Sequence, residues 1–221
     1  MPLQIGDSSS EGWAGVKDIR VGGIAVNSVA MPKGKSWLEL WRRDPHVIEI
    51  DSSTTLLSPS WALYVDVVII GGGGGGAAGD GAVSNHGYGG NSGGYKSATR
   101  IVQPGQGLEF TIGLGGAGSK TEKGPGSIGG TTTFTHMDYS LDVTGGPGGR
   151  GTGTTANATG GDAWEYKLDG WNIMGAKGGA IDKPGQAPGA GGGGGSGGIF
   201  GRWSPGQAGG KGGAWVRFRS A

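Results

Sequence analysis

Apolar and polar residues alternate along several short segments of this chain, a pattern typical of half-buried β-strands. The clearest case is the segment 108–114, in which every second position is apolar. These apolar positions, which should share one face of a strand, are Leu108, Phe110, Ile112 and Leu114. Similar patterns predict further strands at residues 98–102, 131–135, 140–143 and 214–219. No window of useful length has helical periodicity, so the pattern predicts an all-β fold.

The closing segment 214–219 gives a prediction for each face of its strand. Val216 and Phe218 should face inward, toward a core. The residues that alternate with them, and should therefore point outward, are Trp215, Arg217 and Arg219.

The first 46 residues predict a small N-terminal β module. Residues 16–21 and 24–29 flank the pair Gly22-Gly23 in the manner of a two-residue hairpin. Residues 37–41 follow as another strand.

Residues 47–221 should form a second, glycine-rich domain. The two strands that open it are predicted at residues 47–50 and 65–70, with Ser58-Pro59-Ser60 in the turn region between them. The composition changes at the end of the second strand, because residues 71–221 carry 50 of the 56 glycines in the chain.

This glycine content admits two interpretations. Glycine loses more conformational freedom on folding than any other residue, about 0.5–1 kcal/mol per site relative to Ala. The region is therefore either a flexible tail or a backbone arrangement that only glycine fits. Disordered segments are poor in aromatic residues, whereas this region holds Trp164, Trp171, Trp203 and Trp215. The aromatic residues favour the ordered arrangement.

The glycines are concentrated in tracts separated by the predicted strands. The tracts are residues 71–76, 89–94, 145–153, 175–179, 189–198 and 206–213. None keeps a strict Gly-X-Y repeat, so a collagen triple helix is rejected. A three-residue-per-turn extended helix has no internal hydrogen bonds, and such helices packed side by side can bond to one another. We therefore predict packed polyglycine II helices within a β-sandwich-like domain.

Charge and composition exclude several classes of function. The 18 Lys and Arg residues nearly balance the 17 Asp and Glu residues, giving a net charge of +1 with no basic stripe for nucleic acid. There is no cysteine, which removes disulfides and thiol chemistry. The longest apolar stretch, residues 61–70, is short and contains Asp66, so no membrane insertion is expected.

No motif indicates catalysis. Gly71, Gly73 and Gly76 satisfy G-x-G-x-x-G after a strand, but glycines interrupt the segment that would have to form the following helix. His46, His86 and His136 stand in unrelated contexts. We therefore expect no enzyme activity, no metal site and no cofactor.

The aromatic residues of the glycine-rich domain are the candidates for contact with a receptor or glycan. The segment 164–171 lies between glycine tracts and should sit at the end of a hairpin of glycine rods, where amphipathic rings can face a ligand. The alternative is that its tryptophans cap the glycine lattice and seal it from water. The candidate residues are Trp164, Tyr166, Trp171, Trp203 and Tyr88.

The order of strands and glycine runs resembles a known family. The matching segments are residues 65–70, 71–76, 104–118, 129–134 and 209–218. In this order they resemble the glycine-rich domain of minor tail proteins from phages of actinobacteria, over about residues 47–219. The chain is also similar to the tip adhesins on the long tail fibres of T-even-like phages, whose polyglycine II rods are joined by recognition loops. Unlike those adhesins, it has strands between its glycine tracts.

The resemblance implies a virion structural protein, made in the host cytoplasm and assembled into the phage tail at its tip or in a fibre. It implies no catalytic residues. Residues 1–46 would dock onto other tail proteins, with Trp37, Leu40 and Trp41 as the candidate contacts, and a homo-oligomer, with a trimer favoured, is expected. The rigid domain would contribute to host-surface recognition.

Two alternatives to this hypothesis remain open. The first is a dedicated adhesin that binds a cell-surface glycan through its aromatic loops. The second is a non-viral glycine-rich structural or ice-binding protein, although the chain has no regular Thr or Ala repeat that would give an ice-binding face.

Overall fold

The computed structural model describes most of the glycine-rich domain and parts of the N-terminal module. The described residues are 3–5, 19–21, 24–26, 28–33, 36–42, 44–81 and 85–220. In the strands before residue 43 the description covers the backbone. The side chains of Trp37, Leu40 and Trp41, the predicted docking residues, therefore lie outside it.

Two antiparallel sheets form the base of the glycine-rich domain. The first has the order β10-β8-β17-β6, with β6 (His46–Ile50), β8 (Tyr64–Ile70), β10 (Tyr95–Ile101) and β17 (Gly213–Arg219). The second has the order β13-β12-β11-β7, with β7 (Thr54–Leu57), β11 (Gly107–Thr111), β12 (Thr132–His136) and β13 (Tyr139–Val143). The fold is therefore all-β, as the alternation predicts.

The core between the two sheets comes from the residues that alternate inward. The fully buried members include Val65, Val67, Ile69, Leu108, Phe134, Val216 and Phe218. The rings of Phe110 and Phe134 stack with their centroids 5.1 Å apart. The inward positions predicted for Val216 and Phe218 are thus confirmed.

The predicted strands at residues 47–50 and 65–70 are confirmed as β6 and β8, although β7, which lies between them in the sequence, was not predicted. Two local predictions need correction. Leu114 is exposed rather than inward, because β11 ends at Thr111 and the chain continues as a glycine rod. Trp215 is buried on the outer face of its sheet, because a hairpin covers that face.

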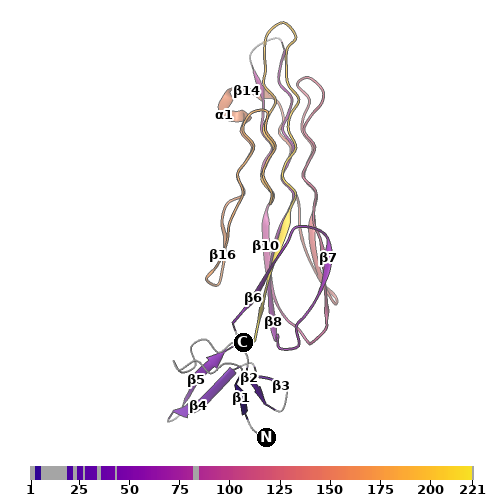
Figure 1. The fold of residues 1–221 in the computed structure, drawn as a ribbon. Coiled ribbons are helices and arrows are strands. Elements are labelled where there is room, and N and C mark those ends of the chain that lie inside the picture. The colour runs from indigo at the N-terminus through magenta and orange to yellow at the C-terminus, as the bar shows by residue number, and fades with distance from the viewer. Residues whose placement is uncertain are drawn as a thin grey trace.

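Extended glycine segments run out from the sandwich and return to it, forming a bundle of rods (Figure 1). The segment 71–80, here called the central rod, is buried along its whole length. Its N–H groups bond to three different neighbours in strict rotation, over 2.8–3.2 Å. Residues 71, 74, 77 and 80 donate to the segment 85–94, residues 72, 75 and 78 to 124–130, and residues 73, 76 and 79 to 204–210.

The carbonyl groups of the central rod follow the same three-residue period. They accept N–H groups from three further segments, 116–123, 146–149 and 192–198. Six neighbours therefore surround one rod, which is the lateral bonding that three residues per turn makes possible. The donor-side neighbours run antiparallel to the rod and the acceptor-side neighbours run parallel to it. The predicted packing of polyglycine II helices is confirmed.

Glycine is required inside this lattice because the rods leave no room for a Cβ atom. A Cβ on Gly74 would lie 2.8 Å from the carbonyl oxygen of Gly146 and closer still to that of Pro147. The segment 189–195 is buried in the same way and also has six neighbours. These two adjacent rods form the interior of the bundle.

On the outer rods every third residue faces solvent and carries a side chain. One such series is Leu114, Ala117 and Lys120, and another is Pro205, Ala208 and Lys211. Prolines fit these outward positions, because proline has a suitable φ and its missing N–H would have no neighbour to bond. The exposed prolines of the bundle include Pro125, Pro147 and Pro205.

The N-terminal strands form two small antiparallel groups. β1 (Leu3–Ile5), β2 (Ile19–Val21) and β3 (Ile24–Ala25) make one sheet, and β4 (Ser28–Lys33) pairs with β5 (Ser36–Arg42). The register Val21↔Ile24 confirms the predicted hairpin, and its second strand ends at Ala25, earlier than expected. The predicted strand at residues 37–41 lies within β5. Figure 1 places these strands beyond the end of the sandwich that is opposite the rods.

Candidate ligand-binding surfaces

The aromatic segment predicted at the end of the rods folds back onto the sandwich instead. Its strands β15 (Tyr166–Leu168) and β16 (Trp171–Ile173) form a hairpin whose turn, Asp169-Gly170, has positive φ at both residues. Figure 1 shows β16 on the sandwich side of the bundle, alongside β10. The hairpin packs over Val68, Ile70 and Trp215 and so buries the outer face of the first sheet.

Tyr166 and Trp171 hold this hairpin against the sheet. The ring of Tyr166 stacks on Tyr95 with centroids 5.1 Å apart, and its hydroxyl lies 3.0 Å from the Ser97 hydroxyl. The Arg217 guanidinium lies 5.1 Å from the centroid of the Trp171 ring. Both side chains are half-buried, so packing accounts for their position. Their contact with a receptor stays a prediction.

A buried ionic network lies beside the hairpin, centred on Asp66. This carboxylate is fully buried and accepts hydrogen bonds from Arg217 Nε at 2.8 Å, Arg219 Nε at 2.7 Å and Thr99 Oγ1 at 2.8 Å. Burial alone would raise the pKa of Asp66, but the hydrogen bonds from Arg219, Thr99 and Arg217 outweigh it and hold the pKa below its ordinary value. The network joins β8, β10 and β17 and has a structural role.

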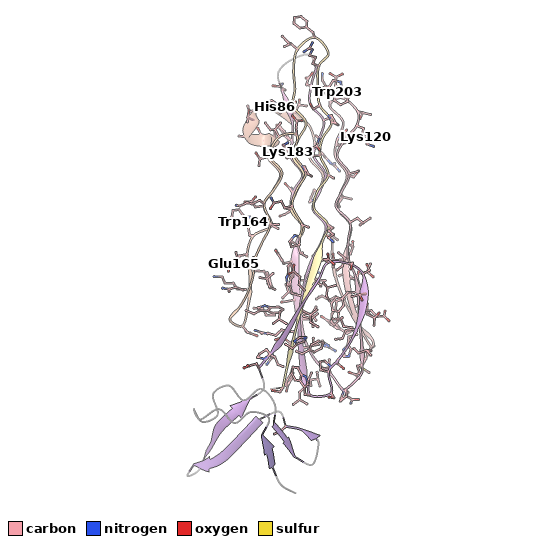
Figure 2. The ribbon with its side chains drawn as sticks, viewed as in Figure 1. His86, Lys120, Trp164, Glu165, Lys183 and Trp203 are labelled. Atoms are coloured by element: carbon pink, nitrogen blue, oxygen red, sulfur yellow. The ribbon has the colours of Figure 1, made fainter. Side chains whose placement is uncertain are left out.

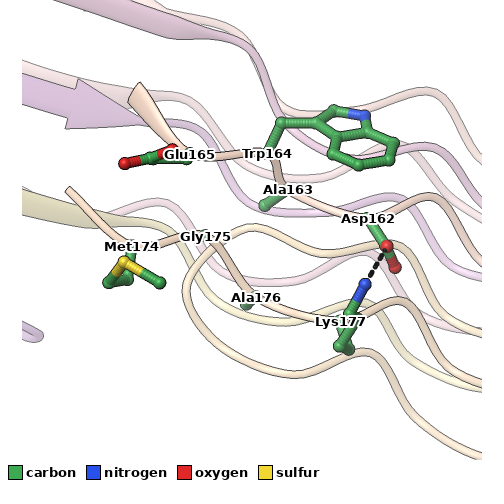
Figure 3. Close-up of a pocket in the computed structure, with 8 residues that line it drawn as sticks. All are labelled: Asp162, Ala163, Trp164, Glu165, Met174, Gly175, Ala176 and Lys177. Atoms are coloured by element: carbon green, nitrogen blue, oxygen red, sulfur yellow. Dashed lines mark hydrogen bonds and ion pairs between the residues drawn. The ribbon is translucent and has the colours of Figure 1, made fainter. Parts of the chain in front are cut away.

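Trp164 is the most exposed of the five aromatic candidates, at 74%. It lies where the rods give way to the β15–β16 hairpin, beside the bridge between Ala163 and Ala176. Figure 3 shows its indole on one side of a hollow of about 170 Å³, with Met174 and Glu165 toward the hairpin. The indole presents a flat apolar face to solvent.

Each charged group that lines this hollow has an ionic partner, and Glu165 Oε2 lies 3.6 Å from Lys167 Nζ. Lys177 Nζ lies 2.7 Å from Asp162 Oδ2 and 5.9 Å from the centroid of the Trp164 ring. Asp162 Oδ1 also accepts the Gly178 N–H at 2.8 Å. The hydrogen bond from Lys177, together with that from Gly178, lowers the pKa of Asp162. The hollow at Trp164 therefore offers stacking surface but no unpaired charge of its own.

Tyr88 and Trp203 lie elsewhere, on the rod bundle. The half-buried ring of Tyr88 packs against Gly151 and Gly153, close to the pairing of β9 (His86–Gly87) with β14 (Thr152–Gly153). Figure 2 shows Trp203 near the far end of the rods, at the level of His86 and away from Trp164. The five candidates therefore do not converge on one site.

Two of the three histidines, His86 and His136, have local structural contacts. His86 Nδ1 accepts the Gly197 N–H at 3.1 Å, beside the short helix α1 (Thr155–Ala158). His136 is buried, with its Nε2 3.1 Å from Gln106 Oε1, and burial followed by the nearby Arg100 lowers its pKa. Within the described residues no group of three or more His, Cys, Asp or Glu side chains could hold a metal ion. No helix in that part of the chain is long and apolar enough to cross a membrane.

The site residues predicted from the sequence did not include Lys177 and Asp162, which lie beside Trp164. They also did not include Lys120 and Gln207, which line a hollow with Trp203. The three-residue spacing of side chains along the outer rods could have indicated two of these residues. Lys120 and Lys177 both stand at outward positions of this period, in the series 114, 117, 120 and 174, 177, 180. No sequence pattern of this kind indicates which rods lie side by side, and that arrangement decides what each side chain faces.

A family model described as a glycine-rich domain matches residues 50–180. The matched segment contains the central rod, the whole second sheet and the β15–β16 hairpin. No curated protein matches the chain.

Proposed function

This chain belongs to the glycine-rich domain family, and we propose that it serves as a minor tail protein of a bacteriophage virion, at the tail tip or in a fibre. The observation that carries the proposal is the central rod with its six hydrogen-bonded neighbours. Hydrogen bonds at every level along the bundle resist bending and local opening. A body of this kind can hold distal loops at a fixed distance from an attachment base.

The two ends of the molecule suit different tasks. The N-terminal strands lie at the sandwich end, and the loops between rods lie at the other end (Figure 1). In this proposal residues 1–46 attach to other tail proteins, and copies of the chain assemble as a homo-oligomer, with a trimer favoured. The rod bundle then points away from the particle.

Immunolabelling of phage particles tests this function. Antibodies raised against the purified chain are applied to intact particles released from the strain that encodes it. We expect gold label at the tail tip or along a fibre. Label confined to the cytosol or the cell wall, with none on particles, would overturn the proposal and favour the non-viral structural alternative.

A second candidate function is a dedicated adhesin, which the exposure of Trp164 favours. An aromatic face open to solvent on a rigid support stacks on a sugar ring at little conformational cost. Purified protein should then compete with phage adsorption, and Trp164→Ala should abolish the competition. Leu114→Ala, at another exposed apolar residue, is the matched control. Equal competition by the wild type and Trp164→Ala would reject Trp164 as the contact.

A further inference from the structure

A hollow on the rod bundle lies between the segments 117–120 and 203–208. It has a volume of about 510 Å³, and its lining includes Ala117, Gly118, Lys120, Trp203, Gln207 and Ala208. We call this the shaft groove. It exists because the outward positions of the two rods at this level, Ala117 and Ala208, carry only methyl groups. Larger side chains stand at the next outward positions, Leu114 and Lys120.

Backbone donors remain unused in the groove lining. The N–H groups of Ala117, Gly118 and Ala208 have no hydrogen-bond partner in the part of the chain that the structure describes. The reason is their place in the lattice. Gly116 donates to the central rod and Gly209 donates to the Gly116 carbonyl, whereas the N–H groups of these three residues meet no carbonyl group of a neighbouring rod. An occupant rich in hydrogen-bond acceptors would satisfy them.

The side chains of the groove add a cation, an amide and an aromatic face. Lys120 is exposed and forms no ion pair with any described residue. The Gln207 amide donates to the Pro205 carbonyl at 3.2 Å, which leaves its own carbonyl oxygen and second N–H unused. Trp203 is half-buried at the edge, held by its bridge to Gly197. No carboxylate lines the groove.

We propose that the shaft groove binds an anionic glycan of the uronic acid class. The Trp203 ring stacks on the apolar C–H face of a sugar ring, and Lys120 pairs with its carboxylate. The backbone N–H groups of Ala117, Gly118 and Ala208 and the Gln207 amide donate to its hydroxyl and carboxylate oxygens. This inference rests on the proposed function, in which the rods meet a cell surface, and it names the ligand class that they meet there.

Other occupants fit these groups less well. A neutral glycan would leave Lys120 unpaired. A small inorganic anion would leave the face of Trp203 and the row of N–H groups uncovered. A glycine rod of a second copy could accept the N–H groups but brings no charge for Lys120. Self-association through the groove is therefore the competing outcome of the test.

Isothermal titration calorimetry on the full-length protein tests the proposal. The probes are tetrasaccharides of galacturonate, glucuronate-containing hyaluronan and mannuronate, with maltotetraose and inorganic phosphate as neutral and charge-only controls. We expect at least one uronate probe to bind and both controls to fail. Trp203→Ala should weaken binding by about tenfold, and Lys120→Gln by about three- to tenfold.

Two more variants separate the groove from folding and from the other exposed tryptophan. Ala208→Leu fills the groove without removing any contact of the fold, because Ala208 is exposed, and it should abolish binding while the melting temperature stays unchanged. Trp164→Ala should bind as the wild type does. The proposal is overturned if no uronate probe binds, or if Trp164→Ala loses binding as much as Trp203→Ala. It is also overturned if Ala208→Leu changes the self-association of the protein and leaves uronate binding unchanged.

Failure of this inference can be told from failure of the proposed function. Uronate binding that depends on Trp203, in a protein that never labels phage particles, would sustain the groove and reject the tail assignment. Label on tails without any uronate binding would support the tail assignment and reject glycan binding by the groove.

Discussion

Replacing Gly75 with alanine tests the lattice directly. Gly75 lies in the middle of the central rod, and a Cβ there would lie 2.8 Å from the carbonyl oxygen of Gly116 and closer still to that of Ala117. Non-bonded heavy atoms need about 3.5 Å, so the two rods would have to move apart by about 1 Å. The central rod cannot retreat, because it has neighbours on all sides, so the outer rod would have to move toward solvent.

The cost follows from the hydrogen bonds that join these two rods. Gly116 N–H donates to the Gly73 oxygen at 2.8 Å, and Ser119 N–H donates to the Gly76 oxygen at 3.0 Å. A separation of about 1 Å takes both beyond hydrogen-bond range. Each buried loss costs about 1–3 kcal/mol, and the lower entropy of the unfolded alanine chain returns about 0.5–1 kcal/mol. We therefore expect the free energy of unfolding to fall by about 1–5 kcal/mol, out of a typical total of about 5–15 kcal/mol.

The matched control is Gly94→Ala, at the exposed end of a rod. A Cβ there would meet only the Val143 Cγ2 atom, at 3.5 Å, which is an ordinary contact. Its stability should be unchanged or higher by up to about 1 kcal/mol. Calorimetric melting of the three proteins measures the difference, and we expect Gly75→Ala to melt about 10 °C below the wild type. Equal melting temperatures for Gly75→Ala and Gly94→Ala would refute the close-packed lattice.

Three further predictions address the three-residue period of the rods, the ionic network at Asp66 and the loop that contains Phe200. In amide hydrogen exchange followed by NMR, the Gly116 amide should be strongly protected and the neighbouring Ala117 amide should exchange fast. The reason is that only the Gly116 N–H bonds to another rod. Equal exchange rates at the two amides would contradict this prediction. The lowered pKa of Asp66 means that its contribution to stability is complete above about pH 4 and is lost as the pH falls through the folded-state pKa. In urea unfolding at neutral pH, Asp66→Asn should lower the free energy of unfolding by about 3–5 kcal/mol, because it leaves the partly buried Arg217 and Arg219 without this counter-charge. The variant should also lose less stability than the wild type as the pH is lowered; an equal loss would show that other groups control stability at acid pH. Phe200 has φ 58° and is 92% exposed, so Phe200→Gly should raise the unfolding free energy by about 1 kcal/mol; a loss of stability would reveal a contact of the ring.

Much of the sandwich could be predicted from the alternation of side chains. The strands β12, β13 and β17 lie within one residue of their predicted bounds, whereas β11 ends at Thr111, before the end of the predicted segment 108–114. The prediction from alternation was wrong where another element covers the face of a strand that would otherwise be exposed. Trp215 occupies the outward side of β17 but is buried, because the β15–β16 hairpin covers that side.

The candidate site was predicted less well, because residues close in sequence are separated in space. Trp164, Tyr166 and Trp171 stand within eight positions, yet only Trp164 is largely exposed. Trp203 and Lys120 are far apart in sequence but line one groove. A glycine rod has no side chains to specify its neighbour, so no sequence pattern shows which rods will meet.

The sequence by itself determined that the glycine tracts would be ordered. Their glycines are compatible with rods in close contact, their prolines and larger side chains stand at outward positions of a three-residue period, and the apolar strands between them supply a core. The tertiary structure alone decided which rod is central and where a groove opens. The physical reason is that the lateral hydrogen bonds of one glycine rod are the same toward any other. The sandwich, which fixes the point where each rod begins, selects the neighbours.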